Sequence, residues 1–127
     1  MGKILVIDDE KATLSMFRLF LDAYGYTVYT AENGTEGLAI SQKEKPEIVL
    51  TDIKMPGIDG LAILRQIKEI DPNAAVIVIT GHGDPALAEQ AIALDAVDFI
   101  NKPIKKQALD AALEKAKKKL DTTKSAG

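Results

Sequence analysis

Near its N-terminus the chain reads Ile4-Leu5-Val6-Ile7-Asp8-Asp9-Glu10, an unbroken apolar run that ends in three acidic residues. A short apolar run without polar alternation is typical of a strand that is buried on both faces. In a single small domain, such a strand belongs to a parallel sheet with helices on either side. The stretch therefore predicts a doubly wound α/β fold, and it places the acids at the carboxyl end of the strand.

The same alternation of strand and helix continues along the chain. The predicted strands are Ile4–Ile7, Thr27–Tyr29, Ile48–Thr51, Ala75–Thr80 and Val97–Ile100. The predicted helices are Lys11–Tyr24, one that begins near Asn33 or Gly34, Asp59–Ile70, one that begins at Asp84-Pro85, and Lys105–Leu120. Gly25 is expected to stop the first helix, and Asp84 can cap the fourth. We expect a single domain over residues 1–121 and a flexible tail over residues 122–127.

The composition excludes several classes of function. The chain has 127 residues and no cysteine, so disulfides, thiolate nucleophiles and cysteine-based metal sites are absent, and the single His82 cannot build a metal cluster. A net charge of −3 argues against binding to nucleic acid, whose partners usually carry surplus Lys and Arg. No apolar run approaches the ~20 residues of a membrane span, and no signal-peptide pattern follows Met1. We therefore expect a cytoplasmic protein without a membrane partner.

Polar residues gather at the carboxyl ends of four predicted strands. Asp8 and Asp9 follow the first strand, Asp52 the third, Thr80 ends the fourth, and Lys102 follows the fifth. Ligands of parallel α/β sheets bind at this edge. Converging carboxylates repel one another unless a cation lies between them, and an all-oxygen ligand set suits Mg²⁺, which often shares its coordination with phosphate oxygens. The pattern indicates a Mg²⁺ site built for phosphate.

Four motifs together carry a resemblance to a known family. Besides residues 4–10 they are Asp52-Ile53-Lys54-Met55-Pro56-Gly57-Ile58-Asp59-Gly60, Val78-Ile79-Thr80-Gly81-His82-Gly83-Asp84 and Asp98-Phe99-Ile100-Asn101-Lys102-Pro103. Over residues 3 to about 120 the chain resembles the receiver domain of two-component response regulators, including chemotaxis receivers. The stretch from Thr80 to Asp84 resembles the receivers of regulators that activate sigma-54 transcription. The resemblance implies a flavodoxin-like receiver fold, with five parallel strands in the order 2-1-3-4-5 and five helices.

The resemblance also implies a role for each acid. Asp52 would be the phosphoacceptor, taking a phosphoryl group from the phosphohistidine of a sensor histidine kinase or a phosphotransfer protein. Asp9, Asp52 and the backbone carbonyl of Lys54 would bind Mg²⁺ directly, and Asp8 would bind it through a water. The chain would then be a phosphoprotein of a phosphorelay and would catalyse only its own phosphorylation and dephosphorylation.

Other residues are expected to bind the phosphoryl group or to tune its transfer. Thr80 and Lys102 would bind phosphoryl oxygens, Gly81 would leave room for the group, and the Lys102-Pro103 peptide bond would be cis. Lys54 and His82 would flank the mouth of the site and tune the rates of phosphorylation and hydrolysis. A role for His82 as a general base is the less favoured reading.

Phosphorylation is expected to act as a switch. Thr80 would move toward the phosphate, and Phe99 would rotate into the vacated space. This would reshape the face formed by the fourth helix, fifth strand and fifth helix, which would contact an effector protein or an effector domain missing from this chain, or a second copy in a phosphorylation-dependent homodimer. Three departures from the family lie near this face: Asp95 stands where glycine is usual, Val97 where an aromatic residue is common, and Ile104 where phenylalanine is usual.

Two other functions are compatible with parts of this pattern. One is a constitutive interaction module that never takes phosphate, against which the intact set of site residues argues. The other is a phosphatase-type enzyme that also uses an aspartyl phosphate. Such enzymes usually need a second acid two residues after the nucleophile, where this chain has Lys54, and a substrate cap for which 127 residues leave no room.

Overall fold

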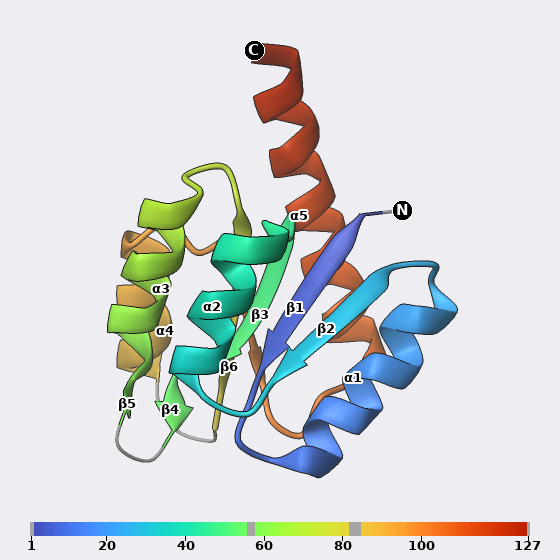
Figure 1. Cartoon of the computed structure of the whole chain (residues 1–127), viewed down its shortest axis with the longest axis vertical. Coiled ribbons are helices and arrows are strands. Elements are labelled where there is room, and N and C mark those ends of the chain that lie inside the picture. The colour runs from blue at the N-terminus through green and yellow to red at the C-terminus, as the bar shows by residue number, and fades with distance from the viewer. Residues whose placement is uncertain (1, 56–57, 82–84, 127) are drawn as a thin grey trace.

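The computed structural model describes residues 2–55, 58–81 and 85–126 and has the predicted alternation of strands and helices (Figure 1). Its elements are β1 (Lys3–Ile7), α1 (Lys11–Ala23), β2 (Thr27–Ala31), α2 (Gly34–Glu44), β3 (Ile48–Asp52), β4 (Lys54–Met55), β5 (Ile58–Asp59), α3 (Gly60–Ile70), β6 (Ala75–Thr80), α4 (Pro85–Ala93), β7 (Asp98–Asn101) and α5 (Lys106–Ala126). All predicted elements are present.

The structure differs from the prediction in the length of the last helix and in an additional pair of short strands. Helix α5 continues to Ala126, beyond its predicted end at Leu120, because a helix can persist after its apolar stripe has ended. The expectation that residues 122–127 are flexible stays a prediction. The strands β4 and β5 form a small antiparallel pair, with Lys54 opposite Asp59, in a segment where no strand was predicted.

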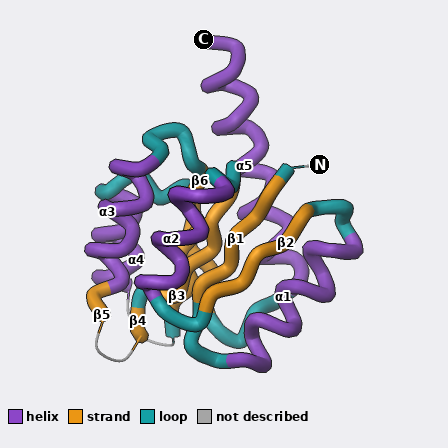
Figure 2. Tube along the Cα trace, in the orientation of Figure 1, coloured by secondary structure: helices purple, strands orange, loops and turns teal. Residues whose placement is uncertain are grey.

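The main sheet has five parallel strands in the order β2-β1-β3-β6-β7, which confirms the expected order. Figure 2 shows β2, β1 and β3 of this sheet side by side. Because all its strands run the same way, their carboxyl ends lie along one edge of the sheet. The strands β1, β3 and β6 are central, and apart from Lys3 at the start of β1 they are buried along their whole length.

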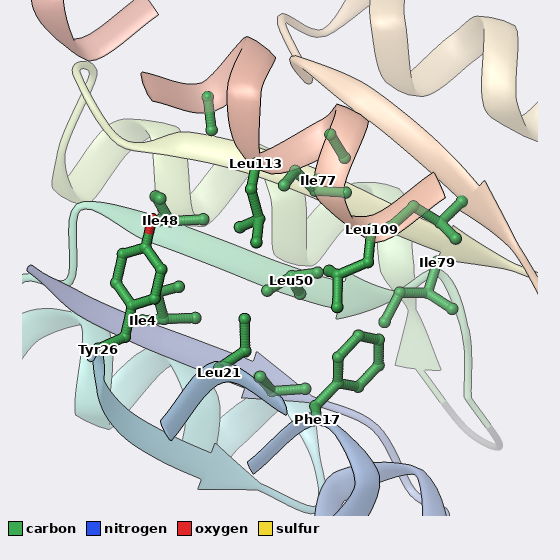
Figure 3. Close-up of a cluster of buried hydrophobic side chains, with 14 of the residues drawn as sticks. Ile4, Phe17, Leu21, Tyr26, Ile48, Leu50, Ile77, Ile79, Leu109 and Leu113 are labelled. Atoms are coloured by element: carbon green, nitrogen blue, oxygen red, sulfur yellow. The ribbon is translucent and has the colours of Figure 1, made fainter. Parts of the chain in front are cut away.

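Helices cover both faces of this sheet, and the core divides accordingly. Ile4 and Val6 of β1 belong to a cluster with α1 and α5, whereas Leu5 and Ile7 belong to a second cluster with α3 and α4. Figure 3 shows Phe17 of α1 and Leu109 and Leu113 of α5 in the first of these clusters. This double burial explains why the strands are apolar throughout. Among the described helices, none combines the length and hydropathy needed to cross a bilayer.

Short-range signals fix several helix ends. Gly25 follows α1 with a φ of 94°, as expected for a glycine that ends a helix. The side chain of Asn33 accepts a hydrogen bond from the Glu36 N–H at 2.8 Å and caps α2. Asp59 caps α3 in the same way, accepting from the Leu61 N–H at 2.9 Å. The predicted cap at Asp84 lies outside the described residues.

A group of charges that we call the Asp95 cluster joins three elements at the amino end of β7. Asp95 follows α4 and has a φ of 75°, a left-handed conformation that favours glycine. Its Oδ2 lies 3.1 Å from Nζ of Lys68 on α3 and 3.1 Å from Nζ of Lys119 on α5. Lys68 also donates hydrogen bonds to the carbonyls of Pro72 and Ala74. The Asp95 cluster therefore ties the end of α4 to α3 and α5.

Candidate functional site

The polar residues singled out in the sequence converge at the carboxyl edge of the sheet, where the strand arrows of Figure 1 end. Asp8 is fully buried, and Asp52 and Thr80 are only 3% and 2% exposed. Asp9, by contrast, is exposed. Two carboxylates and a hydroxyl are thus held away from water beside the central strands, where burial must be compensated by partners.

Lys102 supplies the cation for these acids. Its Nζ lies 3.1 Å from Oδ2 of Asp52, 3.2 Å from Oδ2 of Asp8 and 2.7 Å from Oε1 of Glu10. Burial alone would lower the pKa of Lys102, but the three carboxylates outweigh it and raise that pKa above its ordinary value. Lys102 is therefore charged at every physiological pH. We call this group of four residues the Lys102 cluster.

Asp8 is the least satisfied member of the Lys102 cluster. Burial raises the pKa of its carboxyl, and the opposing effects of the Glu10 N–H, 2.9 Å from Oδ1, and of Lys102 are smaller. Lys102 Nζ is close to Asp8 Oδ2 but off the direction of a good hydrogen bond, and within the described chain that oxygen accepts none. A buried carboxylate oxygen in this state favours a further cation or a proton.

The acids also offer a ligand set for a metal ion. Carboxylate oxygens of Asp8, Asp9 and Glu10 lie within 4.8 Å of one another. A set made only of oxygens, with one buried oxygen lacking a directed hydrogen bond, fits Mg²⁺. Glu10 had no role in the prediction, although it directly follows the two predicted acids. Its direction could not be predicted because the alternation of faces ends with the strand.

Thr80 has a side-chain partner that the sequence reasoning also missed. Its Oγ1 donates a hydrogen bond to Oδ1 of Asn101 at 2.6 Å. The two residues face each other in the register of β6 and β7. Only the alignment of these two strands could have revealed the contact, since 21 positions separate the residues in sequence.

The structure describes some of the remaining predicted site residues and leaves others out. A Cβ placed on Gly81 would meet no atom within 4 Å, so the space beside it is open. The Lys102-Pro103 peptide bond is cis. The backbone of Lys54 belongs to β4, but its side chain and the whole of His82 lie outside the described residues. Phe99 is 41% exposed, and its role as a switch stays a prediction.

A groove of about 700 Å³ lies beside this edge, between α4, β7 and α5. Its walls include Pro85, Ala88, Phe99, Asn101, Lys105 and Ala108. Lys102 lines it as well, so the groove and the Lys102 cluster share a residue. This is the face that the resemblance to receiver domains implies will change on phosphorylation.

Comparisons with known proteins agree with this arrangement. The profile of the response regulator receiver domain matches residues 4–114. Sporulation initiation phosphotransferase F of Bacillus subtilis is 37% identical over 101 residues, which cover 80% of this chain and 82% of that protein. The DNA-binding transcriptional regulator NtrC of Salmonella typhimurium is 38% identical over 115 residues, or 91% of this chain but 24% of the regulator.

The fold is shared with solved structures as well. A response regulator receiver domain protein from Clostridium thermocellum superposes with a TM-score of 0.89 at 39% identity, covering 100% of both chains. Against regulators such as NtrC, by contrast, the chain spans about a quarter of their length.

Proposed function

The chain belongs to the response regulator receiver domain family, a family of signalling domains, and from that premise we propose that Asp52 accepts a phosphoryl group from the phosphohistidine of a sensor histidine kinase or a phosphotransfer protein. One observation carries the proposal. Asp52 is a buried carboxylate at the carboxyl end of a central strand, with the Lys102 ammonium 3.1 Å away and open space beside Gly81.

The proposed transfer is a single displacement at phosphorus. An oxygen of the Asp52 carboxylate attacks, and the new O–P bond forms as the P–N bond to the donor imidazole breaks. The ring nitrogen keeps the electron pair of that bond and takes a proton from water. Lys102 pairs with a phosphoryl oxygen and the Thr80 hydroxyl donates to another, which supplies the positioning and charge neutralisation that phosphoryl transfer requires.

The acids would hold a divalent cation during this step. Asp9, Asp52 and the carbonyl of Lys54 would bind Mg²⁺ directly, with Asp8 acting through a water, and Glu10 offers a further carboxylate. Mg²⁺ neutralises the negative charge that develops in phosphoryl transfer. The proximity of Asp8, Asp9 and Glu10 supports this assignment. The side chains of Lys54 and His82 would tune the rates of phosphorylation and hydrolysis without being required.

Phosphorylation would then act at a distance. The phosphoryl group adds roughly −1.5 to −2 charges, and a complete reversal of a two-state equilibrium from 1:99 to 99:1 needs about 5.5 kcal/mol. The Thr80 hydroxyl moves to the phosphate, Phe99 turns inward, and the groove between α4, β7 and α5 changes shape. The altered face would bind an effector protein or domain in the cytoplasm, or pair with a second copy of the chain.

Intact mass spectrometry tests the phosphoacceptor. After incubation with Mg²⁺ and acetyl phosphate, we expect one phosphoryl adduct on the wild type and none on Asp52→Ala. Asp95→Asn is the matched control, because it removes a carboxylate from the Asp95 cluster and should keep the adduct. If the wild type shows no adduct after rapid quenching and binds no beryllofluoride, the domain is a constitutive interaction module. Sedimentation with and without beryllofluoride tests the homodimer, which a monomer in both conditions would exclude.

A further inference from the structure

We propose that Asn101 is a latch that holds the Thr80 hydroxyl away from the phosphoryl site and thereby sets how readily the switch operates. The inference rests on the proposed function. It assigns a positioning role to a residue for which neither the sequence motifs nor the family comparison supplied one. It starts from the 2.6 Å hydrogen bond in which Thr80 Oγ1 donates to Asn101 Oδ1.

Backbone pairing fixes the two ends of this contact. Thr80 and Asn101 are register partners at the ends of the parallel strands β6 and β7. The next residue continues the ladder, since the Lys102 N–H donates to the Thr80 carbonyl at 2.8 Å. The latch therefore joins side chains on two strands that cannot slide past each other, and it lies directly beside the lysine of the Lys102 cluster.

The alternation of faces places the latch next to Phe99. On β6, Ile79 packs in the cluster with α1 and α5, so Thr80 is on the opposite face. On β7, Ile100 packs in that same cluster, so Phe99 and Asn101 share the face of Thr80. Phe99 and Asn101 both line the groove between α4, β7 and α5. Asn101 is thus a neighbour of both residues of the proposed switch, opposite Thr80 on β6 and two positions after Phe99 on β7, and it lies at the surface that a partner would contact.

A hydroxyl has a single hydrogen to donate. Thr80 can donate it to Asn101 or to a phosphoryl oxygen, but not to both. Thr80 is 2% exposed, so water cannot easily replace the lost acceptor during the exchange. Phosphorylation must therefore break the latch, and removal of the Asn101 acceptor should shift the balance toward the phosphoryl-bound arrangement.

The first test is a double-mutant cycle on binding of beryllofluoride with Mg²⁺. We expect Asn101→Val to bind this phosphoryl mimic about 2- to 12-fold more tightly than the wild type, the range that corresponds to the net worth of one neutral hydrogen bond. In the Thr80→Val background, which lacks the donor, the same substitution should leave the affinity unchanged. An equal gain in both backgrounds, or no gain in the wild-type background, would overturn the latch.

The second test needs no phosphoryl group. Three-bond NMR couplings to the Thr80 methyl group should report one side-chain rotamer in the wild type and averaging in Asn101→Val. Asn101→Asp keeps an acceptor at the same position and should keep a single rotamer. Circular dichroism would establish that each variant is folded.

The two tests separate failure of the latch from failure of the proposed function. A wild type that forms no phosphoryl adduct and binds no beryllofluoride refutes the phosphoacceptor, and the NMR couplings then decide the latch alone. A Thr80 rotamer that is unchanged in Asn101→Val overturns the latch whether or not the domain binds the mimic.

Discussion

The Lys102 cluster and the Asp95 cluster have opposite compositions. In the Lys102 cluster one ammonium lies between the carboxylates of Asp8, Glu10 and Asp52. In the Asp95 cluster one carboxylate lies between two ammonium groups. The settings differ as well, since the Asp8 side chain is fully buried and that of Asp95 is 70% exposed.

The pKa shifts of the two aspartates have opposite signs. Burial raises the pKa of Asp8, and its partners compensate only in part. For Asp95 burial also acts to raise the pKa, but the hydrogen bonds from Lys68 and Lys119 outweigh it and lower the pKa. The comparison teaches that surplus buried negative charge marks a place that needs a ligand, whereas a carboxylate compensated by two lysines only links elements.

The largest expected effect comes from removing Lys102, and the matched substitution in the Asp95 cluster is at Lys119. Lys102→Met leaves two buried carboxylates without their cation and should lower the free energy of unfolding by about 3 kcal/mol. Lys119→Met leaves Asp95 with Lys68 and with solvent, and should cost less than about 1 kcal/mol. Urea denaturation without divalent metal measures both. Mg²⁺ should restore stability to Lys102→Met, and equal losses in the two variants would contradict the comparison.

The pH dependence should separate the two aspartates. Because the pKa of Asp8 is raised in the folded protein, the native state binds that proton more tightly, and stability falls as pH rises from about 4 through the raised value. The free energy of unfolding of Asp8→Asn, relative to that of the wild type, should therefore rise with pH over this range, by at most about 1.4 kcal/mol per pH unit. Urea denaturation from pH 4 to 7 without Mg²⁺ measures the difference.

Asp95→Asn is the control for this measurement, because the pKa shift of Asp95 is opposite in sign to that of Asp8. Since the pKa of Asp95 is lowered in the folded protein, its stabilisation is present above about pH 4 and is lost as pH falls through the lowered value. Asp95→Asn should therefore be less stable than the wild type by a constant amount between pH 5 and 7. That amount should be less than about 1 kcal/mol, as is usual for exposed ion pairs. A deficit that grew over that range would show that the comparison assigns the signs wrongly.

The smallest effect is expected at the backbone of Asp95. Asp95→Gly relieves the left-handed conformation at a φ of 75° but loses both ion pairs, so the net change should stay within about 1 kcal/mol. Asp95→Ala loses the same ion pairs and keeps the unfavourable conformation, so it should be less stable than Asp95→Gly. Thermal unfolding of the two variants gives the order, and the reverse order would mean that the left-handed conformation at residue 95 does not limit the stability of this turn.

The sequence alone determined the fold and the main site residues. Apolar strands buried on both faces predict a parallel sheet wherever they occur, and the residues that follow such strands must meet at one edge. Asp8, Asp52, Thr80 and Lys102 could be placed together on that basis. Helix-ending signals such as Gly25 act within a few residues, so they too could be read without the tertiary structure.

Only the tertiary structure decided which side chains pair across the molecule. Glu10 and Lys102 are 92 positions apart, and Thr80 and Asn101 are 21 apart, so no local pattern relates them. Asp95 was recognised as a departure from glycine, but its two lysines come from α3 and α5. These contacts depend on strand register and on the directions of side chains in loops, where the periodicity that guides sequence interpretation has ended.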